Sequence, residues 1–206
     1  AARLPDVRVG EPVLEVRRNT GAGKVLVRSR SGTELFDHVV LASHSDQSRR
    51  LLTDAEAGER DVLARVGYQP NRAILHTDPR LMPASRKVWS AWNYLSTDGA
   101  APDVAVTYLL NKLQPLPFKS PVFVSLNPLI EPRPESVIAE FDYAHPVFDR
   151  AAIAAQKRLP EVQGRRRVWL AGAWTGFGFH EDGLKSGLAV AEAIRSHDRQ
   201  SERLAP

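Results

Sequence analysis

The chain has 206 residues, of which 43% are hydrophobic and 25% are charged, so it can bury a core and has neither a disordered nor a fibrous composition. Its 28 basic and 24 acidic residues leave a net charge of only +4, which gives no reason to expect nucleic acid as a partner. The absence of cysteine excludes disulfides, thiolate metal sites and a cysteinyl link to a cofactor.

No apolar run reaches the ~18 residues that a transmembrane helix needs, and the opening segment AARLPDVRVG has no signal-peptide core. We therefore expect a soluble, cytoplasmic chain with no transmembrane segment. The one dense basic run, RRR at 165–167, comes directly before an apolar segment. It is more often a solvated turn than a contact for an anion or a partner.

The amino-terminal part of the chain has β character. Strand patterns at 13–16, 24–29 and 36–43 are separated by turn signals. The third ends in HVVLAS, an unbroken apolar run that is typical of a strand buried on both faces of a parallel sheet. Helix patterns follow at 46–53 and 54–66, and Asp54 is the expected N-cap of the second.

From about 70 to 146 the chain is rich in proline, which is typical of a twisted sheet with irregular edges. The strand patterns of this region lie at 72–77, 88–95, 105–110, 122–127 and 137–144. A helix pattern at 149–159, a strand at 167–173, a glycine-rich turn at 174–183 and a helix at 184–197 complete the chain.

This order predicts a mixed α/β fold with a discontinuous domain. Residues 1–45 and 151–206 would form parts of one nucleotide-binding layer, because both contain strands that suit a sheet flanked by helices. Residues 46–150 would form an inserted domain with a mixed or antiparallel sheet.

The strongest local signal is the run VWLAGAWTGFGFHEDGLKSGLAVAEAI at 168–194. A strand, a glycine-rich turn and a helix in this order bring main-chain N–H groups and a helix amino terminus to one point, which favours an electronegative ligand. The glycines of the run, at 172, 176, 178 and 183, would let a flat ligand lie against the main chain. An ordinary β-loop-α crossover has the same spacing, so the pattern alone leaves both readings open.

The segments LAG (170–172) and DGLKSG (182–187) resemble the carboxy-terminal FAD motif of the flavin-containing amine oxidase family. The resemblance implies an FAD-dependent oxidoreductase with non-covalent FAD. It implies that Gly172 and Ala173 meet the ribityl and pyrophosphate groups. It further implies that main-chain N–H groups of Asp182, Gly183 and Leu184 approach the pyrimidine edge of the flavin, where the helix dipole would stabilise negative charge.

A second resemblance lies at 7–43, which looks like the family segment in which the main chain of a valine, here Val13, pairs with adenine. The family's amino-terminal βαβ unit, with Gly-x-Gly-x-x-Gly and an acidic residue, has no counterpart in the 206 residues. We therefore expect a fragment, or a chain whose dinucleotide-binding half is a separate polypeptide. Exposed surface of the nucleotide-binding layer would then permit self-association.

The chain also departs from the amine oxidases. Asn71 or Arg72 occupies the place where many of them carry a lysine, so amine oxidation itself is not implied. His180 occupies the position at which members of the family have a tyrosine of the aromatic cage beside the flavin. It is the one candidate for a catalytic residue, and the alternative is that it only packs against its neighbours. His76 and His145 are expected to be structural or surface residues, and His44 either faces the cofactor or caps a strand end. No metal motif is present, because the HED segment at 180–182 lacks the spacing of a zinc site.

Six aromatic residues alternate with apolar residues in the proline-rich region. They are Trp89, Trp92, Tyr94, Tyr108, Phe118 and Phe123. This alternation is more typical of residues in a core. The second interpretation is an aromatic-lined pocket for a small, apolar or amine-like substrate. The sequence thus predicts dehydrogenation of a small molecule by the intact protein, with no convincing acid or base. The alternative is a ligand-binding or assembly module without catalytic activity.

Overall fold

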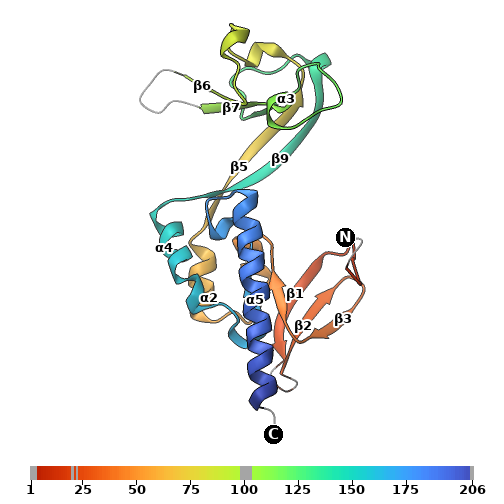
Figure 1. Cartoon of the computed structure of the whole chain (residues 1–206), viewed down its shortest axis with the longest axis vertical. Coiled ribbons are helices and arrows are strands. Elements are labelled where there is room, and N and C mark those ends of the chain that lie inside the picture. The colour runs from red at the N-terminus through yellow and green to blue at the C-terminus, as the bar shows by residue number, and fades with distance from the viewer. Residues whose placement is uncertain (1–3, 20, 22, 98–103, 205–206) are drawn as a thin grey trace. The chain divides into compact units, whose positions relative to one another are not determined.

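The computed structural model describes residues 4–19, 21, 23–97 and 104–204, and the chain divides into two compact units. The first unit contains Ala1–Tyr68 and Pro146–Pro206, and the second contains Gln69–His145 (Figure 1). Residues 46–68 thus lie in the first unit, whereas the sequence pattern placed them in the insertion.

The first unit contains two small sheets and most of the helices. Its strands are β1 (Val13–Asn19), β2 (Lys24–Ser29), β3 (Thr33–Phe36), β4 (Val39–Leu41) and β10 (Val168–Leu170). Its helices are α1 (Ser45–Leu51), α2 (Ala57–Ala64), α4 (Arg150–Arg158) and α5 (His180–Leu204). Short 3-10 turns lie at Leu159–Glu161, Arg165–Arg167 and Ala173–Thr175. Helix α5 begins at His180, so the HEDG segment that we expected in a turn forms its first turn.

The two sheets of this unit differ in direction. Strands β1, β2 and β3 form an antiparallel meander, whereas β4 and β10 pair in parallel, with Val39 opposite Val168 and Leu41 opposite Leu170. The parallel pair agrees with the apolar HVVLAS pattern, because Leu41 and all three residues of β10 are buried.

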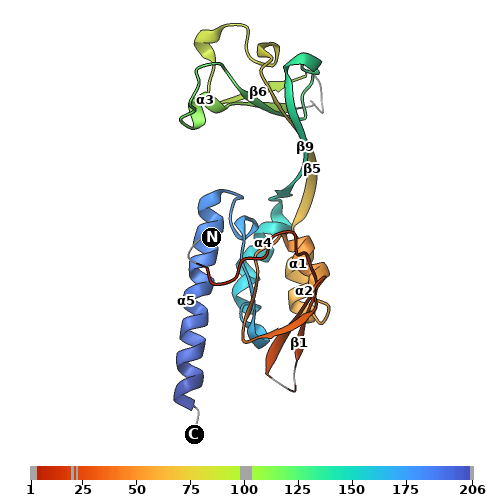
Figure 2. The same ribbon diagram turned by 90° about the vertical axis from the view of Figure 1, so that its right-hand side faces the viewer.

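The main core of the first unit lies between the strands and helices α1, α2 and α4, and Figure 2 shows α2 beside α4. Its largest fully buried side chains include Val16, Val25, Leu52, Val62, Leu63, Val162 and Val168. A smaller cluster, made by Trp169, Ala171 and Val190, attaches α5 to β10.

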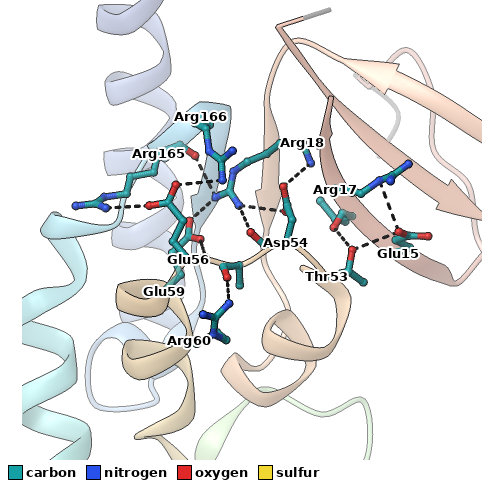
Figure 3. A network of polar contacts seen from close by, with 12 residues as sticks. Glu15, Arg17, Arg18, Thr53, Asp54, Glu56, Glu59, Arg60, Arg165 and Arg166 are labelled. Atoms are coloured by element: carbon teal, nitrogen blue, oxygen red, sulfur yellow. Dashed lines mark hydrogen bonds and ion pairs between the residues drawn. The ribbon is translucent and has the colours of Figure 1, made fainter. Parts of the chain in front are cut away.

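A buried arginine joins three parts of the first unit (Figure 3). The Arg18 guanidinium donates to Glu59 on α2, to Asp54 before it, and to the carbonyl oxygen of Arg165. The side chains of Arg165 and Arg166 pair with Glu56, at 3.0 and 3.1 Å. The basic run at 165–167 is therefore a turn tied to the amino terminus of α2 rather than a simple solvated turn.

The second unit is built on an antiparallel sheet with the strand order β6-β7-β8-β5-β9. The strands are β5 (Gly67–His76), β6 (Trp92–Ser96), β7 (Val104–Leu109), β8 (Phe123–Leu126) and β9 (Val137–Val147), and a short helix α3 covers Leu110–Leu113. The expected strand at 88–95 was wrong at its start, since Arg86–Val88 is a 3-10 turn. Among the described helices, none is long and apolar enough to span a bilayer.

Candidate functional site

The end of β10 meets the start of α5 in the first unit. Ala171 N–H donates to the carbonyl oxygen of Leu41 at 3.0 Å, which extends the parallel pairing by one residue. Gly172 follows with φ at 139°, a value that L side chains rarely adopt, and its N–H donates to Ser186 Oγ on α5 at 2.9 Å. This bond fixes the first turns of α5 beside the end of the strand.

The Asp182 carboxylate holds the glycine-rich loop against the helix. Its Oδ2 accepts hydrogen bonds from the N–H groups of Phe177 and Phe179, both at 3.0 Å. A Cβ on Gly176 would lie 2.6 Å from Asp182 Cγ, so the loop needs glycine there. Asp182 thus closes the loop onto α5, and the pattern of small residues in the sequence did not reveal this role.

Gly183 and Gly187 lie one helical turn apart on α5, and Gly187 borders open space. A Cβ on Gly183 would lie 3.7 Å from the nitrogen of Ala173, an ordinary contact, and one on Gly187 would have no protein atom within 4 Å. Protein packing alone therefore does not require glycine at either position.

The donors expected at the helix start are partly used within the chain. The N–H groups of Asp182 and Gly183 both donate to the carbonyl oxygen of Phe179, at 3.0 and 3.2 Å. The helix behind them has 25 residues, and the positive end of its dipole lies at His180. These two N–H groups therefore already have a partner within the chain, and a ligand at this end would gain from the dipole.

Val13 lies on an apolar groove that follows β4. The groove encloses about 210 Å³ and is lined by Val13, Val16, Val27, Val39, Val40, Leu41, Ala42, Ser43 and Leu51. At its end, the Ser43 carbonyl oxygen is 3.7 Å from the Cβ position of Gly172. The structure therefore brings Gly172, Ala173 and the first turn of α5 together, with Val13 on the groove that runs toward them.

The two outer edges of the parallel pair, one on β10 and one on β4, differ in their hydrogen-bond partners. On β10, the Gln163 side chain accepts from Leu170 N–H at 2.9 Å and donates to its carbonyl oxygen at 2.6 Å, in the manner of a neighbouring strand. Strand β4 has β10 as its only partner strand in the described part of the chain, and Val40 is 41% exposed. The β10 edge is capped, whereas the β4 edge is open.

A larger, mostly apolar cavity of about 700 Å³ lies beside α5. It is lined by Gln156, Leu159, Pro160, Gln163, Trp169, Thr175, Gly176, Asp182, Lys185, Ser186, Ala189, Val190 and Ala193. The small residues Ala189 and Ala193, one helical turn apart, leave this space on α5. Sequence reasoning missed the cavity, because its walls come from segments that are individually ordinary.

The histidines fall into different environments. His180 is the exposed first residue of α5, so it lies beside the candidate site. His44 is the N-cap of α1 and stacks on Tyr68, with ring centroids 4.5 Å apart, which supports the capping role. His145 is exposed, and its Nδ1 accepts a hydrogen bond from Asn71 Nδ2 at 2.9 Å.

His76 is part of a buried polar chain in the second unit. Asp78 N–H donates to its Nδ1 at 3.1 Å, so its Nε2 carries the proton and donates to Ser125 Oγ at 2.9 Å. Ser125 Oγ in turn lies 2.7 Å from Thr107 Oγ1. The pair has the residues of a serine–histidine nucleophile, but the histidine is a donor and His76 and Ser125 are fully buried. Its role is structural.

The aromatic residues of the second unit divide between core and surface. Trp89 and Phe123 pack with Met82 and Leu109 in the core, as expected. Trp92 and Tyr94 on β6 are 46% and 66% exposed, and Trp92 lies edge-on to Tyr108 with centroids 5.5 Å apart. The same face of the sheet carries apolar residues of β7 and β8 in register, Val106 and Leu126 among them. An aromatic sheet face is therefore exposed within this unit.

The positions that replace the family lysine are engaged in polar contacts. Arg72 forms ion pairs with Glu140 and Glu131. Asn71 accepts a hydrogen bond from Asn127 Nδ2 at 2.7 Å. The Arg72 guanidinium is a permanent cation paired with two carboxylates, so it cannot take the role of a free amine.

The fold is the mixed α/β fold of the FAD-dependent amine oxidases, as the sequence predicted. A putrescine oxidase with a redesigned cofactor site matches with a TM-score of 0.63 and 10% identity over 95% of this chain and 50% of its own length. A putative protoporphyrinogen oxidase from Exiguobacterium sp. 255-15 matches with a TM-score of 0.60 and 15% identity over 93% and 48%.

A fatty acid isomerase from P. acnes, which produces CLA, matches with a TM-score of 0.56 and 15% identity over 88% of this chain and 47% of its own. The chain thus spans about half the length of the structures it matches. No family model and no curated protein matches the sequence. At these identities the likeness shows the fold, and the three names point to three different substrates.

Proposed function

We propose that this chain is the carboxy-terminal half of an FAD-dependent oxidoreductase that dehydrogenates a small, apolar or amine-like substrate. The observation that carries the proposal is the junction of β10 with α5. There, Gly183 and Gly187 leave room that no packing requires, beside the positive end of a long helix dipole. A relation to oxidoreductases is supported by the oxidases among the structural neighbours.

In this proposal the chain binds one side of a non-covalent FAD. The main chain at Gly172 and Ala173 would face the ribityl and pyrophosphate groups. The first turn of α5, from Asp182 to Leu184, would face the pyrimidine edge of the flavin, and Val13 would face the adenine. Bound FAD would accept a hydride, and with it both electrons that the substrate loses, while the second hydrogen would leave the substrate as a proton. The α5 dipole would stabilise the negative charge that this transfer leaves at the pyrimidine edge. His180, at the exposed start of α5, is the candidate for contact with substrate or flavin.

The rest of the FAD would be held by a dinucleotide-binding half outside these 206 residues. Two observations support this: the chain matches about half of each neighbour, and the edge of β4 is open while that of β10 is capped. We place a strand of the other half on the β4 edge, over the groove that begins at Val13. Within the second unit, the exposed aromatic face with Trp92 and Tyr94 is the candidate surface for an apolar or amine-like substrate.

The test is the absorption spectrum of the chain produced together with its dinucleotide-binding half. We expect flavin absorption, and acid precipitation should release all of the colour because no cysteine is present for a thioether link. A Val40→Lys variant should lower the yield of the yellow complex, since a charge on an edge strand opposes pairing. The matched control is Val88→Lys, at an exposed residue of the second unit. A colourless complex would overturn the proposal.

The alternative is a ligand-binding or assembly module that has lost catalysis. The exposed aromatic face of the second unit favours it, because such a face suits an apolar ligand without needing a cofactor. The two functions differ in one measurement. A complete protein that binds an apolar fluorescent probe, loses this binding in Trp92→Ser, and contains no flavin would be such a module.

A further inference from the structure

A cluster of two histidines and one aspartate lies away from the candidate FAD site, in the first unit. His38 directly precedes β4, and His197 and Asp198 lie near the carboxyl end of α5. One ligand atom from each, His38 Nε2, His197 Nδ1 and an Asp198 carboxylate oxygen, lies within 4.8 Å of the others. His38 and His197 are 159 positions apart in the sequence, so no sequence motif reveals the cluster.

We propose that His38, His197 and Asp198 bind a divalent transition-metal ion, such as Zn²⁺ or Co²⁺. Two imidazoles and a carboxylate are typical ligands of these ions, and three protein ligands leave a position for water. Metal–ligand bonds of ~2.0–2.2 Å place tetrahedral ligand atoms roughly 3.3–3.6 Å apart. The Asp198 oxygen is 2.9 Å from His38 Nε2 and 3.7 Å from His197 Nδ1, so small side-chain movements would admit an ion.

The His197 ring nitrogen gives independent support. Among the described residues, His197 Nδ1 is a buried polar atom with no hydrogen-bond partner. Such atoms are rare, since leaving a buried polar atom unpaired costs free energy. The two histidine rings meet edge to face with centroids 5.1 Å apart, so both are already turned toward the carboxylate. A metal ion among the three side chains would satisfy this nitrogen.

The charges around the cluster suit a cation. Among the described residues, the Asp198 carboxylate has polar contacts with His38 and His197 only, and no lysine or arginine competes for it. The nearby Arg199 and Arg195 are instead paired with Glu192.

A hydrogen bond from Trp169 influences the affinity of the proposed site for a metal ion. Its indole N–H donates to His38 Nδ1 at 3.1 Å, which leaves the ring proton on Nε2, where it points to Asp198. Metal binding at Nε2 requires the single ring proton to move to Nδ1, so Trp169 loses its acceptor. The metal site therefore competes with the Trp169 hydrogen bond. We expect moderate affinity and a change in Trp169 fluorescence on binding.

The experiment is a Co²⁺ titration of the untagged chain, followed by visible absorption and tryptophan fluorescence. We expect one Co²⁺ per chain, displaced by Zn²⁺, with no thiolate band because the chain lacks cysteine. His197→Gln and Asp198→Asn change surface-accessible side chains and should each weaken binding at least tenfold. The matched control, His145→Asn in the second unit, should bind as the unchanged chain does.

Trp169→Phe supplies a test that a merely structural cluster would not pass, since it should tighten Co²⁺ binding by freeing His38 Nδ1. Circular dichroism of each variant verifies that it is folded. If Trp169→Phe does not fold, His38→Asn replaces it and should abolish the Co²⁺ absorption. No binding at millimolar Co²⁺, or equal binding by His197→Gln, Asp198→Asn and the control, would overturn the proposal.

Discussion

Arg18 donates a hydrogen bond to Glu59, and only 2% of each side chain is exposed. The pair joins the meander strand β1 to helix α2, and Asp54 and the Arg165 carbonyl oxygen accept further bonds from the same guanidinium (Figure 3). The burial of two charges is costly unless each is paired and hydrogen-bonded. The first unit must therefore keep both charged side chains paired, and a pattern of apolar residues in the sequence does not reveal this requirement.

Replacing one partner of this pair should destabilise the chain strongly. Glu59→Leu leaves the Arg18 charge buried beside an apolar side chain, and we expect a loss of ~3 kcal/mol in the free energy of unfolding. The double variant Arg18→Met with Glu59→Leu should recover most of this loss, because no charge is left buried. Urea denaturation measures both. Asp37→Ala, which removes the exposed pair with Lys24, should cost under ~1 kcal/mol.

Replacing Gly183 by alanine should change the stability of the chain and its FAD binding in opposite directions. A Cβ at Gly183 makes only ordinary contacts with Ala173, and alanine is the better helix former, so Gly183→Ala should raise the free energy of unfolding by up to ~1 kcal/mol. The same change should lower the flavin content of the complex with the dinucleotide-binding half, and Gly183→Val should lower it further. Gly67→Ala, in open space in β5, is the control. A destabilised Gly183→Val variant with normal flavin content would make Gly183 a packing residue.

His76 should make the stability of the second unit depend on pH. Burial lowers the pKa of His76 below its ordinary 6.5, and the charge of Asp78 opposes this shift. The unfolded chain therefore takes up a proton as the pH falls through 6.5, while the folded chain does not until its lower pKa is reached. Stability should fall as the pH decreases through this window. His76→Gln keeps a hydrogen-bonding side chain and removes the titration, so its slope in urea denaturation should be smaller. An unchanged slope in His76→Gln would contradict the assignment of this pH dependence to His76. The control is His145→Asn.

The sequence predicted the elements whose pattern is local. The unbroken apolar run HVVLAS correctly indicated a parallel strand, but the burial expected on both faces was wrong, since Leu41 is buried while Val40 is 41% exposed. The start of α5 was misplaced because glycine and charged residues in HEDG suggest a turn, whereas the Asp182 carboxylate stabilises a helix start there by binding two loop N–H groups. The start of the strand expected at 88–95 was wrong for a similar reason, since Trp89 follows a 3-10 turn and is buried by tertiary packing.

Parts of the candidate site could not be read from the sequence. The glycines at 172 and 183 were found by their order in a strand-turn-helix run, and the structure brings both to the junction of β10 with α5. The Gln163 cap of β10 and the cluster around His38 depend on segments that meet only in the folded chain. Side chains of ordinary type acquire such roles through tertiary contacts, so local periodicity contains no signal for them.

The 206 residues alone should bind FAD weakly. Their contacts in the proposal are Val13, the end of β10 and the first turn of α5, so the pyrophosphate lacks the glycine loop and the helix dipole that would neutralise it. Loss of several kcal/mol is expected, and each ~1.4 kcal/mol lowers the affinity tenfold. The purified chain should therefore be colourless. Titration of FAD with flavin fluorescence as the readout should show no saturation in the submicromolar range.

Addition of the dinucleotide-binding half should restore tight FAD binding to the chain, because its strand would pair with the open edge of β4 and its glycine loop would hold the pyrophosphate. Sedimentation of the chain alone should show self-association at high concentration, since Val40, Leu184 and Leu188 are 41%, 59% and 62% exposed. Val40→Lys should reduce both this association and the complementation, whereas Val88→Lys should change neither. Saturable, submicromolar FAD binding by the 206 residues alone would contradict the division of the FAD site between two halves, because the contacts named here would then suffice.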